Sequence, residues 1–600
     1  MTGTDADNLR SMFAAVLKRH PERPAITYTP GALGTVRTAG KQTSDWLTLS
    51  WHELAELVMN VAAAMDLVLG GARTVAILAE TDACYPIVEL AVGLTGRTLQ
   101  PLYATSTDDE LRRALTLTEA DLLVLGRSQR HRAGLFEGRR GIVLLDEVVS
   151  LPGVAGAPRA TLPADIETFD TGSLEVQLAQ LPDMPLDRPL LYLQSTGTTG
   201  PARVIEISES AVVQAVRSLR GEASHDFPRF LSFLPPAHIS ERLLTLYLSI
   251  ALAGHTWYGG GLPTLGDDLR ACRPTVLLAP PVLLEGVRAH AIADARATWL
   301  GRRLLASVEM TARRMLATGI AADEKPSWGA RLFGRQLRRR AGLDQLRDAL
   351  TGMAPVPPSL QAWFAAVQIP LRVVYGQTEL MGATSITPRR GGAFGSVGLP
   401  ARGVEVALAD RGELRVRSGS VFTRYVGEEA ATARALEGGW LHTGDLATIS
   451  PQGDIVLCGR VHFVVETKGG ATVNVAALIA EAARRVGDGE FVFVPTDGSA
   501  GVLYAALRPD LLPELETELR PVPADDERWT RMARLVEEMD PQHVISGWAL
   551  FEGVFGQRSG EVGPTGKPRG WRIHELRSGT PVLRTRVCLS SAGQSTRGSS

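Results

Sequence analysis

Cysteine is scarce in this chain, with four residues among 600. Cys84, Cys272, Cys458 and Cys588 lie far apart and never form a Cys-x-x-Cys pair. This spacing argues against both a zinc site and a disulfide framework. Because a buried free thiol behaves as a small hydrophobic group, we expect reduced, mostly structural cysteines in a cytoplasmic protein.

Long apolar runs and a dominant charge are also missing. The longest apolar stretch, near residues 243–254, is shorter than the ~20 residues that a membrane-spanning helix needs. Residues 1–10 lack the apolar core of a signal peptide. The 63 Lys and Arg residues nearly balance the 65 Asp and Glu residues, for a formal net charge of -2. Since nucleic-acid binding typically requires a strongly basic domain, we expect a soluble globular protein with no nucleic-acid partner.

The first 200 residues alternate between helical and strand-like patterns. Apolar residues at helical spacing over 51–67 are followed by the short β-branched run 74–78, and 109–117 is followed by 121–125 in the same order. Strands that alternate with helices predict an α/β fold with a parallel sheet. A chain of this length also predicts at least two domains.

Beyond Gly398 the texture changes to short strands with glycine turns, and a new pattern of strand and helix begins after Gly459-Arg460. We predict a large N-terminal domain of parallel and mixed sheets with flanking helices over 1–458. A small α+β domain is expected over 459–577. The tail over 578–600 is rich in Ser, Gly, Arg and Thr, a composition typical of disorder.

Residues 296–340 contain two basic amphipathic runs, RRLLASVEMTARRML and RLFGRQLRRRAG. Such helices either present a solvated face or lie on an anionic membrane surface. Peripheral membrane contact is therefore one interpretation of this segment.

A loop rich in glycine and hydroxyl groups follows the apolar run that begins at Leu191. Its backbone N–H groups can surround a polyphosphate, and its hydroxyls can bind phosphate oxygens or Mg²⁺. It is not a Walker loop, because no G-x-x-x-x-G-K-[ST] pattern is present. The loop consists of Ser195, Thr196, Gly197, Thr198, Thr199 and Gly200, with Arg203 close behind.

This loop resembles the phosphate-binding signature of the acyl-adenylate-forming superfamily, and further signatures occur in that family's order between about residues 49 and 572. The segment 233–242 resembles long-chain fatty acyl-CoA synthetases in particular. These signatures are Phe233-Leu234-Pro235-Pro236-Ala237-His238-Ile239-Ser240-Glu241-Arg242, Gly352-Met353-Ala354-Pro355, Tyr375-Gly376-Gln377-Thr378-Glu379, Trp440-Leu441-His442-Thr443-Gly444-Asp445, Gly459-Arg460 and Pro564-Thr565-Gly566-Lys567.

The resemblance implies ATP-dependent activation of a carboxylic acid to acyl-AMP with release of pyrophosphate, then thioester formation with coenzyme A. It implies ATP, Mg²⁺ and coenzyme A as cofactors, a medium- or long-chain fatty acid as substrate, and a mobile C-terminal domain. The implied catalytic residues are Lys567, Thr378, Glu379 and Arg460. The implied nucleotide-binding residues are the loop Ser195–Gly200 with Arg203, then Gly352, Ala354, Pro355, Tyr375, Gly376, Gln377, Asp445 and Arg460.

Physical chemistry agrees with several of these roles. Asp445 is an acceptor-only group suited to both ribose hydroxyls, and Tyr375 can stack on adenine. Glu379, with Ser195, offers hard oxygen ligands for Mg²⁺. Thr378 can hydrogen-bond the α-phosphate, and Lys567 can neutralise charge as the carboxylate approaches it. His238 is expected to face the substrate.

Two departures from the family pattern leave alternatives open. Arg203 stands where the family usually has lysine, and the guanidinium binds phosphate with a different geometry. After Arg460 the chain has His462 and Phe463, and residues 469–475 lack the polar pair and proline that typically follow the two glycines. An acyl-AMP ligase that loads a carrier-protein thiol, or a non-catalytic acyl or nucleotide binder, are therefore the rivals. A serine hydrolase is disfavoured because no G-x-S-x-G is present.

Overall fold

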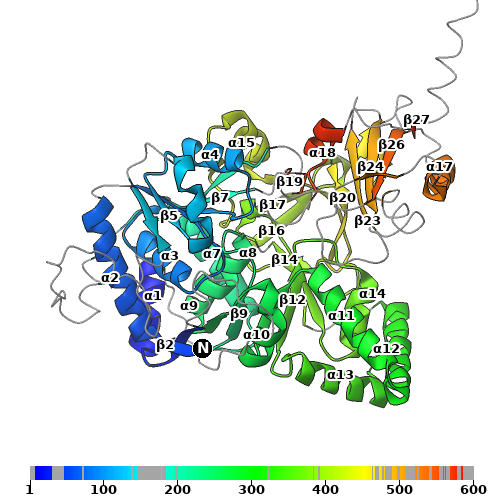
Figure 1. Ribbon diagram of the computed structural model, residues 1–600, viewed down its shortest axis with the longest axis horizontal. Helices are drawn as coiled ribbons and strands as arrows, with labels where there is room; N and C mark the ends of the chain where they lie inside the picture. Colours follow the sequence, from blue (N-terminus) through cyan, green and yellow to red (C-terminus); the bar gives the residue numbers. More distant parts are fainter. Residues whose placement is uncertain are drawn as a thin grey trace, which may run out of the picture.

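The computed structural model builds the chain as a mixed α/β protein of several sheets with flanking helices (Figure 1). This confirms the predicted fold class. The structure describes residues 7–29, 46–69, 73–136, 141–145, 178, 181, 184–195, 201–319, 325–382, 384–389, 392–461, 464–466, 472–475, 479, 489–495, 500–507, 520–522, 526–539, 544–552, 559, 561–562, 568–577 and 583–584.

The largest sheet has seven strands in the order β18-β8-β7-β4-β3-β5-β6. Strands β3 to β7 run parallel, whereas β8 is antiparallel to both β7 and β18. The run predicted as a strand over 74–78 is β3, buried along its whole length, as expected for a parallel strand covered on both faces. The strands are β3 (Thr74–Leu78), β4 (Thr98–Leu102), β5 (Leu122–Leu125), β6 (Gly141–Leu144), β7 (Pro189–Gln194), β8 (Val204–Ser208) and β18 (Arg424–Tyr425).

Helices on the faces of this sheet supply its covering layers. The pattern over 51–67 forms the helix α2, and the pattern over 109–117 forms α4, which begins with a capping box between Thr107 and Glu110. Both predictions of helix followed by strand are confirmed. The helices of this part are α1 (Leu9–Arg19), α2 (Trp51–Leu69), α3 (Cys84–Leu94), α4 (Asp108–Leu117) and α7 (Glu209–Glu222), with the 3-10 segment η2 (Arg127–Phe136).

Two further sheets complete the large body. One has the order β2-β1-β10-β9 and the other β11-β12-β13-β14-β15, in which β11, β12 and β13 are parallel. Their strands are β1 (Pro24–Tyr28), β2 (Leu47–Ser50), β9 (Arg229–Ser232), β10 (His255–Tyr258), β11 (Val276–Ala279), β12 (Asp348–Gly352), β13 (Leu371–Tyr375), β14 (Ser385–Ile386) and β15 (Leu399–Pro400).

Helices α11 to α14 pack around the second of these sheets, whereas α10 packs against β9 of the first. Figure 1 shows α12 and α13 at the outer edge. These two helices are the predicted basic amphipathic runs. The helices are α10 (Leu265–Cys272), α11 (Pro281–Arg296), α12 (Trp299–Thr318), α13 (Trp328–Arg340) and α14 (Pro358–Ala366), preceded by the 3-10 turn η4 (Leu262–Thr264).

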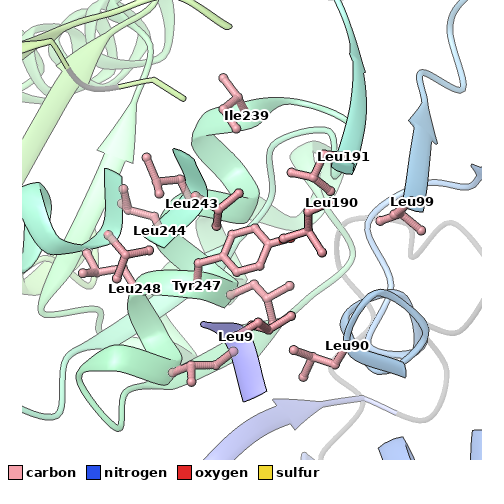
Figure 2. Close-up of a cluster of buried hydrophobic side chains, with 14 of the residues drawn as sticks. Leu9, Leu90, Leu99, Leu190, Leu191, Ile239, Leu243, Leu244, Tyr247 and Leu248 are labelled. Carbon is pink, nitrogen blue, oxygen red and sulfur yellow. The ribbon is translucent and has the colours of Figure 1, made fainter. Parts of the chain in front are cut away.

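The apolar stretch that is too short for a membrane span folds as a buried irregular helix. It begins with the π-helical turn η3 (Leu243–Leu248) and α9 (Ser249–Ala251), which continue the short helix α8 (Ile239–Arg242). Figure 2 shows Tyr247 of η3 enclosed by leucines from β7, α1 and α3, beside Leu243 and Leu244 of its own turn. No helix among the described residues is long and apolar enough to cross a membrane.

Three more sheets follow along the chain. The sheet β16-β17-β19-β20 is antiparallel, β21 pairs with β22, and β23, β24, β26 and β25 form a sheet to which β27 adds an edge. Figure 1 shows this last sheet with α17 and α18 at one end of the molecule. The predicted domain boundary at 458/459 lies inside β20 and stays a prediction.

The elements of this part are 3-10 turns, helices and strands. They are η5 (Thr378–Leu380), β16 (Val404–Leu408), η6 (Asp410–Gly412), β17 (Glu413–Ser418), α15 (Glu429–Ala435), η7 (Glu437–Gly439), β19 (Leu441–Ile449), β20 (Ile455–Arg460), β21 (Val464–Glu466), β22 (Thr472–Asn474), β23 (Gly489–Pro495), β24 (Gly501–Leu507), β25 (Arg520–Pro521), α17 (Glu527–Met539), β26 (Ile545–Glu552), α18 (Gly570–Arg577) and β27 (Leu583–Arg584).

None of the cysteines that the structure describes is in a disulfide. Cys84 and Cys272 are buried and Cys458 is exposed, so the prediction of structural thiols is confirmed for the first two. Cys588 lies outside the described residues.

Candidate active site

A cavity of about 820 Å³ lies where the large sheet, the sheet of β11 to β15 and the sheet of β16 to β20 meet. The carboxyl ends of β7, β12 and β13 reach it, the place where open α/β sheets bind ligands. We call its polar lining the polar end: Arg113, Ser195, Arg203, Gln377, Thr378, Glu379, Glu413, Tyr425, Glu428, His442, Thr443 and Arg460. We call the lining side chains that belong to one hydrophobic cluster the apolar end: Leu219, Leu243, Leu244, Leu278, Leu350 and Val374.

The carboxylate of Asp445 is the centre of a hydrogen-bond network at the polar end. Its Oδ2 accepts from Tyr375 Oη at 2.6 Å and from Gln377 Nε2 at 2.7 Å, while Arg460 Nε lies 2.8 Å from Oδ1. Burial, with the charge of Asp445 beside it, raises the pKa of Tyr375 well above its usual value. Tyr375 therefore stays a neutral donor, and residues from β13, β19 and β20 are fixed against one another.

A second carboxylate orders the turn before Asp445. Glu413 Oε2 lies 2.9 Å from His442 Nδ1, and Glu413 Oε1 accepts from the backbone N–H of Gly444 at 2.9 Å. Gly444 has φ +69°, a left-handed conformation that glycine adopts without a steric penalty. Glu413 thus holds the Thr443-Gly444 turn in place at the cavity wall.

Glu379 and Arg203 are also held by neighbouring side chains. Tyr425 Oη donates to Glu379 Oε1 at 3.0 Å, and Arg203 Nε donates to Glu428 Oε2 at 3.0 Å. The guanidinium of Arg203 lies 4.8 Å from the centre of the Tyr425 ring, within the range of a cation–π contact. Charged groups of both signs therefore line this end in fixed positions.

The predicted phosphate loop connects β7 and β8 as a hairpin. At its base, Ser195 N donates to Arg203 O and Arg203 N donates to Ser195 Oγ, both at 2.9 Å. The base of the loop thus faces the cavity through Ser195 and Arg203. Thr196, Gly197, Thr198, Thr199 and Gly200 lie outside the described residues.

Gly352 ends β12 at the cavity wall. A Cβ atom there would lie 2.3 Å from the carbonyl oxygen of Val374 on β13, so only glycine lets the two strands approach this closely. Met353, which also lines the cavity, has φ +68°, an uncommon conformation of the kind that gathers at functional sites. Ala354 and Pro355 follow on the surface, exposed.

The apolar end continues toward a second, smaller cavity of about 40 Å³. Leu219, Leu244 and Leu350 line both cavities, so these three side chains form the wall between them. Leu244 belongs to the π-helical turn η3, and such turns occur frequently at functional sites.

His238 caps α8 and lines the cavity. Its Nδ1 accepts from the backbone N–H of Ser240 at 3.2 Å and lies 2.8 Å from Ser240 Oγ. Because a backbone N–H can only donate, Nδ1 carries no proton in this arrangement, and a neutral His238 bears its hydrogen on Nε2.

The C-terminal part touches the large body at α4. Arg569 Nη1 lies 2.5 Å from Glu110 Oε1, and the Arg569 side chain is buried. Arg113, which lines the cavity, is one turn further along the same helix. Arg569 follows Lys567 by two residues in the sequence, and Lys567 lies outside the described residues.

The structure gathers most of the predicted residues in one place. Ser195, Arg203, His238, Gly352, Gly376, Gln377, Thr378, Glu379 and Arg460 line the cavity, and Tyr375 and Asp445 are joined to Gln377 by hydrogen bonds.

Sequence reasoning missed several lining residues. Arg113, Tyr425 and Arg434 come from α4, β18 and α15, and Glu428 directly precedes α15; none of these segments carries a recognised motif. In the sequence, the leucines of the apolar end cannot be distinguished from ordinary core residues. Glu413 lies at the start of the run GELRVR, one of the short strands expected beyond Gly398. Its position in a strand does not by itself indicate a functional site.

The chain shares its fold with solved coenzyme A synthetase structures. O-succinylbenzoate coenzyme A synthetase (MenE) of Bacillus subtilis, solved in complex with AMP, matches with a TM-score of 0.63 at 15% identity over 96% of this chain and 98% of that one. The same protein solved in complex with ATP and magnesium ion matches with a TM-score of 0.60 at 16% identity over 90% and 95%.

Sequence comparison then identifies the family. The family described as AMP-binding enzyme matches residues 13–426, and the chain belongs to it. The long-chain-fatty-acid–CoA ligase FadD15 of Mycobacterium bovis is 27% identical over 448 residues, 72% of this chain and 73% of the relative. The long-chain-fatty-acid–CoA ligase heimdall of Drosophila melanogaster is 24% identical over 490 residues, 77% and 70%.

Proposed function

We propose that this enzyme activates a medium- or long-chain fatty acid. A carboxylate oxygen of the acid attacks the α-phosphorus of ATP, pyrophosphate leaves, and acyl-AMP forms. The thiol of coenzyme A then attacks the acyl carbon, AMP leaves, and an acyl thioester forms. The observation that carries the proposal is one cavity with a charged, prearranged end and an apolar end, which suits a nucleotide beside a fatty acyl chain.

The nucleotide is proposed to occupy the polar end. Asp445 would accept from the ribose hydroxyls, with Arg460 beside it, and the segment Gly352–Pro355 with Tyr375 would border adenine. Thr378 would donate to the α-phosphate, and the loop after Ser195 with Arg203 would bind the outer phosphates. The protein contributes positioning and charge stabilisation rather than covalent chemistry.

The residues present fit a magnesium ion bound together with ATP. Glu379 offers a carboxylate on the cavity wall, and Ser195 offers a hydroxyl. No cluster of three or more His, Cys, Asp or Glu ligands occurs among the described residues, which suits Mg²⁺ because it binds through one or two carboxylates plus substrate phosphates. The ion would neutralise phosphate charge during displacement.

The acyl chain is proposed to extend along the apolar end, past His238 toward Leu244. The relatives named above are long-chain-fatty-acid–CoA ligases, which supports both an apolar acid and coenzyme A as acceptor. A carrier-protein thiol remains the alternative acceptor. Of the residues that suggested it, His462, Phe463 and 469–471 lie outside the described residues, and Thr472–Asn474 form the strand β22. The relatives' names favour coenzyme A.

The test is acid-dependent exchange of pyrophosphate into ATP over a series of fatty acids, followed by AMP release with and without coenzyme A. Exchange with AMP release that requires coenzyme A is the expected result. Exchange without that release, restored by a phosphopantetheinylated carrier protein, would instead support the carrier-protein alternative. Absence of exchange with every acid would contradict the proposed reaction.

Lys567 is proposed to stabilise the charge that develops in the first half-reaction. We expect Lys567→Ala to lower the rate of acyl-AMP formation by about a hundredfold or more, while transfer from preformed acyl-AMP to coenzyme A changes little. Lys325→Ala, which changes a lysine that does not line the cavity, serves as the control. Equal loss in both half-reactions would remove Lys567 from this role.

Localisation in the cytoplasm with peripheral membrane contact is also proposed, through α12 and α13. Trp299 and Trp328 are 64% and 77% exposed, and tryptophan beside arginine is typical of helices at a membrane surface. We expect sedimentation with vesicles that contain phosphatidylglycerol but not with pure phosphatidylcholine, and loss of sedimentation in W299S/W328S. Equal recovery with both vesicles, or none, would contradict it. The exposed arginines are Arg302, Arg303, Arg313, Arg314, Arg331, Arg335, Arg339 and Arg340.

A further inference from the structure

Two adjacent charged residues, Glu241 and Arg242, are buried directly after the loop that carries His238. They lie on the one-turn helix α8, with relative exposures of 4% and 2%. Neither lines the cavity. A buried charge that touches no ligand needs a physical account, because its desolvation is costly.

Arg242 reaches back along the chain to the loop. Its Nη2 donates to the carbonyl oxygen of Pro236 at 2.7 Å and lies 3.3 Å from Glu89 Oε2 of α3. Glu89 Oε1 in turn accepts from Tyr247 Oη at 2.6 Å. The guanidinium thereby ties the loop to α3 and to the π-helical turn.

The geometry of the ion pair between Arg242 and Glu89 is poorly suited to stabilising the fold. Nε and Nη1 of Arg242 are buried with no hydrogen-bond partner among the described residues, and an incompletely satisfied buried pair is weak evidence of stabilisation. The shortest polar contact of Arg242 is instead its hydrogen bond to the carbonyl oxygen of Pro236. The geometry thus favours a role in fixing the loop.

Glu241 holds the other end of the same loop. Burial raises the pKa of the Glu241 carboxyl, and the Ser232 side chain and the Leu234 backbone oppose that shift. Thr245 Oγ1 lies 3.2 Å from Glu241 Oε1. Thr81 Oγ1 adds a hydrogen bond to the Leu234 carbonyl at 2.9 Å. Residues 234–236 are therefore held at two points, two residues before His238.

We propose that Glu241 and Arg242, with Glu89 as counterion, are positioning residues that clamp residues 234–236 so that His238 presents Nε2–H to the substrate side of the cavity. We call these three residues the loop clamp. The inference rests on the proposed function, and it assigns the clamp to the acid and its acyl group rather than to the nucleotide.

The decisive variant removes both charges at once. E89Q/R242M leaves no unpaired charge in the core, so it avoids the large penalty of breaking a buried pair from one side. The amide oxygen introduced by E89Q can still accept from Tyr247, and methionine fills the space of the arginine stem. The hydrogen bond to Pro236, the ion pair and a long hydrogen bond from Arg242 Nη2 to Tyr85 Oη at 3.5 Å are lost.

A second buried ion pair supplies the matched control. Arg188 Nη2 lies 2.8 Å from Glu209 Oε2, with side-chain exposures of 10% and 3%, and neither residue lines the cavity. R188M/E209Q therefore makes the same chemical change in the same large domain without touching the loop. Thermal unfolding measured for both variants compares their effects on stability.

The experiment measures the rate of pyrophosphate exchange as a function of the acid concentration and, separately, of the ATP concentration. For E89Q/R242M we expect kcat/KM for the acid to fall by about tenfold or more, since small displacements of a positioned group are costly. We expect KM for ATP to stay within about twofold. R188M/E209Q should change neither. E241Q, which conserves shape, should show the same pattern with a loss of about threefold.

The double-mutant cycle with H238A identifies the route of the effect. If the clamp acts through His238, E89Q/R242M should cost less than about twofold on the H238A background. A full additional loss on that background, an equal loss in R188M/E209Q, or unchanged acid kinetics would each overturn the clamp. Absence of exchange in the wild type with every acid would overturn the proposed function itself, which is a distinguishable result.

Discussion

At the polar end of the cavity, side chains from separate strands are fixed by charged hydrogen bonds, whereas at the apolar end leucines from several elements pack side by side. The single carboxylate of Asp445 contacts three side chains, those of Tyr375, Gln377 and Arg460. Leu244 contributes only its volume to the wall that it shares with Leu219 and Leu350.

The difference teaches what each end tolerates. A buried polar network acts as a unit, and removing one member leaves its partners unsatisfied. An apolar wall accepts changes of size as long as volume is respected, so such changes move specificity more than activity. The polar end should therefore set whether the reaction occurs, and the apolar end should set which acid reacts.

The largest effect is expected from Asp445→Ala. It deletes the proposed ribose acceptor and removes the shared acceptor of Tyr375, Gln377 and Arg460, so kcat/KM for ATP should fall by about a hundredfold while acid preference is unchanged. Exchange kinetics at varied ATP measure this. Asp410→Ala, in an exposed turn, is the control, and an unchanged ATP dependence in Asp445→Ala would remove Asp445 from the site.

A smaller effect, on selectivity, is expected from Leu244. Leu244→Ala joins the two cavities and should raise the preference for longer over shorter acids by about tenfold, since one to two methylenes in an apolar pocket are worth this much. Leu244→Phe should shift the preference toward shorter acids. Leu246→Ala, in the same turn but lining neither cavity, should leave the optimum in place. An unshifted chain-length optimum in both Leu244 variants would show that the acyl chain of the substrate binds elsewhere.

Glu110→Gln tests whether the C-terminal part serves the polar end. The substitution keeps the capping box, which accepts Gln, but removes the charge that faces Arg569. We expect acyl-AMP formation to slow by about threefold to tenfold. Asp109→Asn, a neighbour on α4 whose side chain pairs with Arg112, should change it little. Loss confined to thioester formation would assign this contact to the second half-reaction instead.

A last effect, on stability rather than on catalysis, is a pH dependence of the unfolding free energy. Burial raises the pKa of Glu241 to about 7 from an ordinary 4.5, so the folded state retains a proton that the unfolded chain has lost. The contribution of Glu241 is therefore complete below pH 4.5 and is lost as pH rises to about 7. His255 has the opposite sign, because burial lowers its pKa to about 4.

Glu241→Gln isolates the first of these contributions. Between about pH 5.5 and 7, the wild type should lose about 2 kcal/mol of unfolding free energy relative to the variant. Urea unfolding of both proteins at each pH measures the difference. A constant difference across this range would show that Glu241 does not titrate there.

The polar end was largely predictable from the sequence because its residues sit in short motifs at strand ends. Gln377 and Thr378 follow β13 directly, and Thr443 precedes Asp445 within β19. In each case a few consecutive residues carry both the turn and the chemistry. The alternation of strands and helices likewise predicted β3 and α2 at the places where they occur.

The apolar end and the loop clamp could not be predicted in the same way. Leu219, Leu278 and Leu350 come from α7, β11 and β12, and each is indistinguishable from a core leucine until the elements meet in space. Glu89 is separated by 158 positions from Tyr247, which donates to it, and Arg242 lies on the same distant segment, so no local pattern reveals these contacts. The π-helical turn has no signal in a run of leucines.

The measurement that tests the central claim most directly is acid-dependent pyrophosphate exchange by the wild type as a function of fatty acid chain length. The two-ended cavity predicts exchange that requires an acid, rises with chain length to an optimum and then falls. Exchange that is independent of chain length, or no exchange with any fatty acid, would contradict the assignment of the apolar end to an acyl chain.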